Sequence, residues 1–240
     1  MRAIYSLIFF IAVLTAQAQP TFEGIIELKM SSNERPDMGR TIMYFSNYGG
    51  RLDTEMKLSP TLKNFKTIRI FKKEQPEVYY ILNESASTYS ITDLSGFKPM
   101  PVNDNEQKVR VIGTEKILGY NCTHSIVSTK SGEIELWTTK ELMDYNSYKY
   151  LNESDAKSRN ASLAKSLIEA NAEGFPVKTI RRIGNGSEIT IELVKADKTK
   201  LESFLFEIPT GYTKTTSPTS GMEGMMQEIK QMGEQTIKEE

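Results

Sequence analysis

Apolar and polar residues alternate along most of the chain, as they do in strands that bury one face. Between Phe22 and Met30, for example, nearly all even positions are apolar and most odd positions are charged. Short segments of this kind, separated by turn residues, are typical of an antiparallel sheet. The predicted strands cover residues 22–30, 41–45, 51–58, 67–71, 77–82, 88–91, 108–112, 120–128, 133–138, 177–183, 188–194 and 201–208.

Two of these strands carry positional information. Residues 78–82 are apolar at both odd and even positions, which predicts a central strand with both faces of the sheet covered. Residues 201–208 are followed by Pro209, so we expect this segment to close the sheet. A connection rich in Pro and polar residues, 97–107, is expected to run over the surface.

The apolar period changes from two to that of a helix at two places. Between Asp155 and Ala172 the apolar residues fall on one side of a helix, with Ser154 as its N-cap. From Ser217 onward, methionines recur at helical spacing and predict an amphipathic C-terminal helix. Because Met side chains suit both irregular cores and adaptable binding surfaces, this helix could be docked permanently or act as a lid. Its apolar stripe comprises Met222, Met225, Met226, Ile229 and Met232.

The first residues have the pattern of a secretory signal peptide. Arg2 is followed by an apolar stretch, 4–14, that is too short to span a bilayer, and Ala16-Gln17-Ala18 suits signal peptidase. We therefore expect residues 1–18 to be removed and the mature chain to begin at Gln19. Since no Cys lies near the cleavage site, we expect no lipid anchor, and a soluble protein in the periplasm or outside the cell.

Charge and cysteine content narrow the classes of partner. Loss of Arg2 lowers the formal net charge from −1 to −2, and no basic block remains, so nucleic acid and anionic lipid surfaces are disfavoured as partners. Cys122 is the only cysteine, so no disulfide is expected within the chain. The longest apolar run of the mature chain is residues 78–82, and we expect no membrane-spanning helix.

Few residues suggest catalysis. His124 and Cys122 are two positions apart on a predicted strand and therefore share a face with Tyr120 and Ile126. A zinc site needs more His or Cys ligands than this chain has, so burial in the core is the favoured interpretation of Cys122, with a ligand-facing or redox thiol as the alternative. His124 is the only imidazole and no Gly-x-Ser-x-Gly motif accompanies it, which disfavours a hydrolase triad.

One predicted strand carries two carboxylates and the only tryptophan. Glu133 and Glu135 share a face and could form a glycosidase pair, although their alternation with apolar residues is typical of a solvated strand face. Trp137 has the same parity, and it either packs beneath a loop or borders a groove. We therefore expect a protein without catalytic residues, metal or cofactor.

Three short motifs resemble those of one family. They are Leu118-Gly119-Tyr120-Asn121-Cys122, the segment Glu135–Leu142, and Phe206-Glu207-Ile208-Pro209-Thr210-Gly211-Tyr212, while Phe22-Glu23-Gly24 also fits. With these motifs the chain resembles the exported proteins of domain of unknown function 4412 from Bacteroidetes-type bacteria, which are similar to LolA/LolB-like periplasmic carriers. The resemblance implies an open antiparallel half-barrel wrapped over helices, with an apolar concave face that holds acyl chains. It assigns no role to the motif positions Gly119, Tyr120, Cys122, Trp137, Pro209 and Tyr212.

Together these observations predict an α+β, mainly antiparallel β fold. One curved sheet (residues 19–216) would hold a long helix near 155–172 and the C-terminal helix (217–240) on its concave side. The expected function is non-catalytic binding of an apolar or amphiphilic ligand, lipid or lipoprotein-related, between sheet and helices. The alternative is an envelope protein-protein interaction or stress-related module without a small ligand. The expected ligand-lining residues are Tyr120, Cys122, Ile126, Trp137, Met222, Met225 and Met226.

Overall fold

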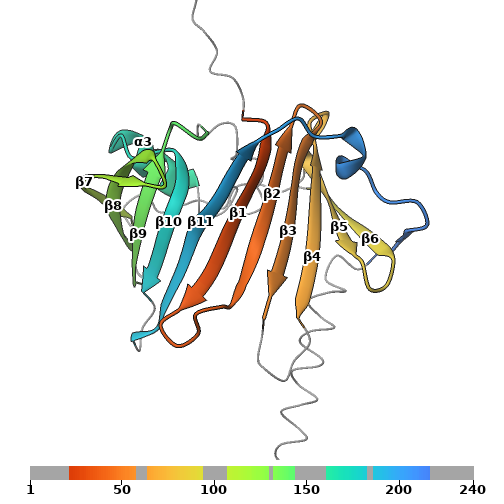
Figure 1. Cartoon of the computed structure of the whole chain (residues 1–240), viewed down its shortest axis with the longest axis horizontal. Helices are drawn as coiled ribbons and strands as arrows, with labels where there is room; N and C mark the ends of the chain where they lie inside the picture. The colour runs from red at the N-terminus through yellow and green to blue at the C-terminus, as the bar shows by residue number, and fades with distance from the viewer. Residues whose placement is uncertain are drawn as a thin grey trace, which may run out of the picture.

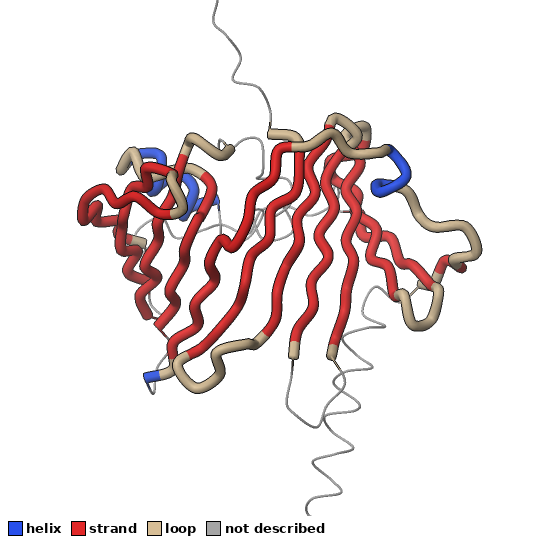
Figure 2. Tube along the Cα trace, viewed as in Figure 1, coloured by secondary structure: helices blue, strands red, loops and turns tan. Residues whose placement is uncertain are grey.

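The computed structural model describes residues 22–57, 64–93, 107–129, 132–143, 161–182 and 186–216. They form one open, curved, twelve-stranded sheet in which all neighbouring strands are antiparallel except the edge pair β6 and β12 (Figures 1 and 2). The strand order is β12-β6-β5-β4-β3-β2-β1-β11-β10-β9-β8-β7. Within these ranges no helix has the length and hydrophobicity that a membrane span requires.

Eleven of the twelve expected strands are confirmed, most within a few residues of the predicted ends, and β7 and β11 run further than expected. Their bounds are β1 (Gly24–Ser32), β2 (Gly39–Ser46), β3 (Gly49–Met56), β4 (Phe65–Lys72), β5 (Gln75–Asn83), β6 (Thr88–Asp93), β7 (Lys108–Ile117), β8 (Tyr120–Thr129), β9 (Gly132–Thr139), β10 (Phe175–Arg182) and β11 (Glu188–Lys198). The remaining elements are α3 (Ala161–Glu169), the 3-10 helix η5 (Ser203–Phe206) and β12 (Thr213–Lys214).

The centre of the sheet is a pairing between distant parts of the chain. β1 lies between β2, its neighbour in sequence, and β11, which follows more than 150 residues later. The expected central position of residues 78–82 is therefore wrong, because β5 lies near the β12 edge. Both of its faces are nevertheless covered: Tyr79 packs against Phe71 on one face, and Leu82 is buried on the other.

The expected strand over residues 201–208 is also wrong. This segment turns through η5 and packs on β3 and β4, and the short β12 adds to the edge of β6 instead. Leu201 and Phe206 are both buried against Ile68, Ile70 and Leu82. Five positions apart, they would point to opposite faces of a strand, whereas the 3-10 turn lets both reach the same surface.

The helix near 155–172 is described from Ala161 to Glu169, and residues 155–160 lie outside the described ranges. It ends earlier than expected in a Schellman motif, with Asn171 in the left-handed region at φ 51°. The N–H of Asn171 donates to the carbonyl of Ile168, and that of Ala172 to the carbonyl of Leu167. The expected C-terminal helix over 217–240 also lies outside the described residues.

Candidate functional site

The two faces of the sheet differ in chemistry. We call the face that carries Ile26 and Leu28 of β1 the apolar face, and the face that carries Glu27 and Lys29 the charged face. The strand register extends both faces across the sheet, since Leu28 lies opposite Thr41 of β2 and Leu193 of β11. The largest apolar cluster, which includes Ile26, Met43, Phe45 and Phe71, lies at one end of the strands.

The apolar face continues beyond this cluster with side chains that are only half-buried. Register places them on five strands, β11, β1, β3, β4 and β5. A large half-buried apolar surface of this kind is a candidate binding surface, since soluble proteins rarely leave one without use. Its apolar members are Leu28, Met30, Leu52, Met56, Phe65, Ile81, Ile189 and Ile191.

Two polar features interrupt this face. A row of threonines crosses the sheet, with Thr41 opposite Thr54 and Thr54 opposite Thr67, and the first two hydroxyl oxygens are 3.3 Å apart. In the adjacent row Arg69 of β4 lies between Leu52 of β3 and Ile81 of β5. The apolar face therefore also offers hydroxyl groups and the half-buried guanidinium of Arg69, while a second arginine of this face, Arg181 beside Ile189, is exposed.

Helix α3 packs on the β7–β9 end of the apolar face. Leu167 of α3 and Ala172, which follows the helix, are buried against Val127 and Leu136. Leu136 lies on the apolar face, because strand pairing links it through Thr179 and Ile191 to Met30. The Thr138 hydroxyl fixes the chain after the helix by donating to the carbonyl of Ala172 at 2.6 Å. The segment with η5 packs on the charged face, since its partners Ile68 and Ile70 have the parity of that face.

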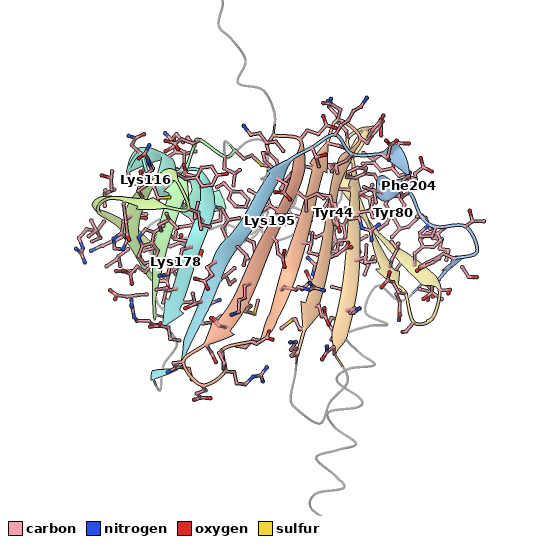
Figure 3. All side chains as sticks on the ribbon, in the orientation of Figure 1. Tyr44, Tyr80, Lys116, Lys178, Lys195 and Phe204 are labelled. Carbon is pink, nitrogen blue, oxygen red and sulfur yellow. The ribbon has the colours of Figure 1, made fainter. Side chains whose placement is uncertain are left out.

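The charged face is covered with ion pairs along its middle strands. Arg51 binds Asp53 at 2.6 Å, and Arg40 reaches Glu55 at 3.3 Å. Figure 3 labels four further residues of this face, Tyr44, Tyr80, Lys178 and Lys195. Such paired charges at partly exposed positions are typical of a solvated surface.

By strand register the described members of the predicted ligand-lining set follow the rows of the charged face, but Cys122 and Trp137 are buried in the same hydrophobic cluster as Ile26, and Tyr120 packs against that cluster. Tyr120, Cys122 and Ile126 share one face of β8, as expected, and their neighbour His124 lies opposite Trp137. The row continues from Trp137 through Lys178 and Glu192 to Lys29, so it belongs to the charged face. Sequence parity thus grouped these residues correctly but could not show that α3 packs on the other side. Residues Met222, Met225 and Met226 lie outside the described residues.

Trp137 is 6% exposed and enclosed by side chains from neighbouring strands. The imidazole of His124 stacks on it with ring centroids 4.2 Å apart and planes 9° apart, and Lys178 Nζ lies 4.9 Å from the ring centroid. Its indole N–H donates to Glu115 Oε2 at 2.8 Å. These contacts satisfy both the polar and the apolar parts of the indole within the protein.

Glu135 is held between two cations or donors. His124 Nε2 lies 2.8 Å from Glu135 Oε1, and Arg182 lies 2.8 Å from Oε2. Burial of Glu135 opposes its ionisation, but the hydrogen bonds from Arg182 and His124 outweigh burial and lower its pKa. The solvated-face interpretation is therefore right for the exposed Glu133 and wrong for Glu135. A carboxylate kept ionised in this way is unsuited to the general-acid role in a glycosidase pair.

Cys122 is 1% exposed, which confirms core packing as its environment. Burial raises the pKa of its thiol, so the reactive thiolate is disfavoured. Among the described residues no group of three His, Cys, Asp or Glu side chains is arranged to hold a metal ion.

The sequence resemblance implied an apolar concave face, but sequence reasoning named none of the residues that form the half-buried apolar face, and it missed Arg69. Leu28 and Met30 in β1, like Ile189 and Ile191 in β11, are apolar residues two positions apart with a polar residue between them. This pattern predicts that each strand has one apolar face, but only the register shows that the apolar faces of the two strands join. Arg69 is the exception to its own strand pattern, because it occupies the parity of Phe65 and Phe71. That break in the alternation is the signal that could have identified it.

Comparison with known proteins gives one family and several distant structures. None of the curated proteins matches the sequence. Similar solved structures include PNGF-II, with 18% identity over 81% of this chain and 31% of that chain and a TM-score of 0.42. MucB in the Pseudomonas aeruginosa MucA/MucB complex has 8% identity over 77% of this chain and 56% of that chain, with a TM-score of 0.41. A LolA superfamily protein from Nitrosomonas europaea has 9% identity over 78% of this chain and 91% of that chain, with a TM-score of 0.33.

The chain thus spans about a third of PNGF-II and about half of MucB, and at these TM-scores the similarities identify no function. The family model of the domain of unknown function DUF4412 matches residues 22–212, from Phe22 to Tyr212, which is the last residue of the third sequence motif. This range is most of the chain and contains all three motifs on which the sequence resemblance rests. The protein therefore belongs to the DUF4412 family.

Proposed function

We propose that the protein is a non-catalytic binding protein for an apolar or amphiphilic ligand, lipid or lipoprotein-related, that lies against the apolar face. The observation that carries the proposal is the row of half-buried apolar side chains on this face, Ile191, Met30, Met56 and Phe65, which register joins through Gly39. Further burial of apolar surface is favourable at about 25 cal/mol per Å², so a ligand with an acyl chain gains affinity from each side chain it covers.

The contrast between the faces supports this placement. The charged face pairs its ions internally, whereas the apolar face has unbranched and γ-branched side chains such as Met30, Met56 and Leu52 that adapt to flexible chains. The expected signal peptide would place the protein in the periplasm or outside the cell, where a soluble carrier shields acyl chains from water. Lining of the ligand by Tyr120, Cys122, Ile126 and Trp137, and a lid formed by residues 217–240, stay predictions.

Binding of a fluorescent fatty acid tests the proposal with a matched pair of variants on β11. Ile191 lies on the apolar face beside Met30, and its neighbour Thr190 lies on the charged face beside Ser31. We expect Ile191→Gln to weaken binding about fivefold, because it removes apolar contact worth roughly 1 kcal/mol. Thr190→Gln should bind as the wild type does.

Two results together would overturn the proposal. One is the absence of any bound lipid when the native protein is extracted into organic solvent and analysed by mass spectrometry. The other is failure of the purified wild type to bind the fluorescent fatty acid at all.

The edge strand β7 favours docking of another envelope protein as a second candidate function. β7 ends the sheet in the described part of the chain, and Val111 and Ile112 on it are more than 40% exposed. An edge strand with exposed apolar residues can accept an extended segment of a partner. A partner captured by the wild type should be lost with Ile112→Lys and kept with Thr114→Lys, and equal capture by both variants would exclude this edge.

A further inference from the structure

Arg69 is placed on the apolar face by the sheet register. It lies opposite Leu52 on one side and Ile81 on the other, and Thr67 precedes it by two positions on the same face of β4. Its side chain is half-buried. A charged group therefore stands where the alternation of β4 otherwise puts apolar or hydroxyl side chains.

Within the described residues Arg69 has no hydrogen bond or ion pair with another side chain. The arginines of the charged face differ, since Arg51 binds Asp53 and Arg40 binds Glu55. Those two carboxylates cannot serve Arg69, because β3 directs them to the opposite face.

The remaining acid on this side of β5 is distant. Glu77 shares the parity of Ile81 but is four residues along the strand, roughly 13 Å away. A guanidinium has five N–H donors in a planar fork that fits a carboxylate or phosphate with two parallel hydrogen bonds. Partial burial without such a partner costs free energy, and an anionic group on the ligand would remove that cost.

We propose that Arg69 binds the anionic headgroup of an amphiphile whose acyl chain lies on the apolar face, an inference that rests on the proposed function. The hydroxyls of Thr54 and Thr67, in the adjacent row, supply further donors for the headgroup oxygens. From a headgroup at Arg69, the acyl chain of the ligand would lie across β3 and β2 toward Leu28 of β1, which is three strand spacings or about 14 Å away. The ligand class is thus a lipid with an acidic headgroup, not a neutral one.

Oleate and oleyl alcohol test this inference, since they share a chain and differ in charge. We expect the wild type to bind oleate roughly tenfold more tightly than oleyl alcohol, the fold-change that one charge-assisted hydrogen-bond pair supplies. Arg69→Met should remove this preference by weakening oleate binding alone, and Arg69→Lys should keep part of it. Arg40→Met, the same change on the charged face of β2, should leave both affinities unchanged.

The outcomes separate the headgroup site from the proposed function. Equal affinity of the wild type for oleate and oleyl alcohol overturns the role of Arg69 while leaving the apolar face as a lipid site, and it decides the matter even if Arg69→Met does not fold. Binding of neither probe overturns the proposed function itself. Binding of acetate or inorganic phosphate as tightly as oleate would show a simple anion site and also contradict the inference.

Discussion

At the scale of single residues, Glu135 links pH to stability. Its pKa is lower in the folded chain than its ordinary value of 4.5, so its ionised form stabilises the fold above that value. This contribution is lost as the pH falls through the lower, folded pKa. We expect Glu135→Gln to lower the free energy of unfolding by about 2 kcal/mol at neutral pH, and the difference from the wild type to shrink in acid.

Urea unfolding at a series of pH values between about 7 and 3 measures this difference. Glu133→Gln is the matched control, because Glu133 is exposed on the same strand face and should change stability little. A difference between Glu135→Gln and the wild type that stays constant with pH would show that the ionised carboxylate of Glu135, with its ion pair to Arg182 and its hydrogen bond to His124, does not stabilise the fold.

The buried thiol of Cys122 gives a second prediction at this scale. Because burial raises its pKa and closes access, it should not react measurably with Ellman's reagent in the native protein at neutral pH. It should react completely once denaturant unfolds the chain. Rapid reaction of the native protein would instead favour the ligand-facing or redox alternative.

For single residues, the sequence predicted which side chains share a face of a strand but not which side chains of other strands they contact. Parity alone put Cys122 beside His124, and the structure confirms it. It could not reveal that Glu115 and Lys178 meet Trp137, because these contacts depend on the pairing of β7 and β10 with their neighbours.

At the scale of elements, the segment around η5 shows where alternation fails as a signal. Leu201 and Phe206 are buried, yet Phe204 between them is 67% exposed. We expect Phe206→Ala to lower the free energy of unfolding by about 3–5 kcal/mol, whereas Phe204→Ala should stay within about 0.5 kcal/mol. Chemical denaturation compares the two directly, and equal losses would favour a regular strand here.

Other elements were predictable because local periodicity decides them. The strands of the hairpins β2–β3 and β8–β9 follow the alternation of their own residues. The helix α3 follows its own apolar stripe, although its early end depends on Asn171 adopting a positive φ, which periodicity does not reveal.

At the scale of the whole molecule, the order of the strands in the sheet could not be predicted from the sequence. The pairing of β1 with β11 joins residues that are far apart in the chain, and no local pattern encodes which strands will meet. The same pairing unites the half-buried side chains of Leu28, Met30 and Ile191 into one face. The apolar face is therefore a property of topology and not of any single segment.

Photo-crosslinking with a diazirine-bearing fatty acid tests that face most directly. After irradiation of the native protein and digestion, mass spectrometry identifies the labelled residues. The account predicts labels on side chains of the apolar face, such as Leu28, Leu52 and Ile191. Labels confined to the charged face around Trp137, or none at all under saturating probe, would contradict it.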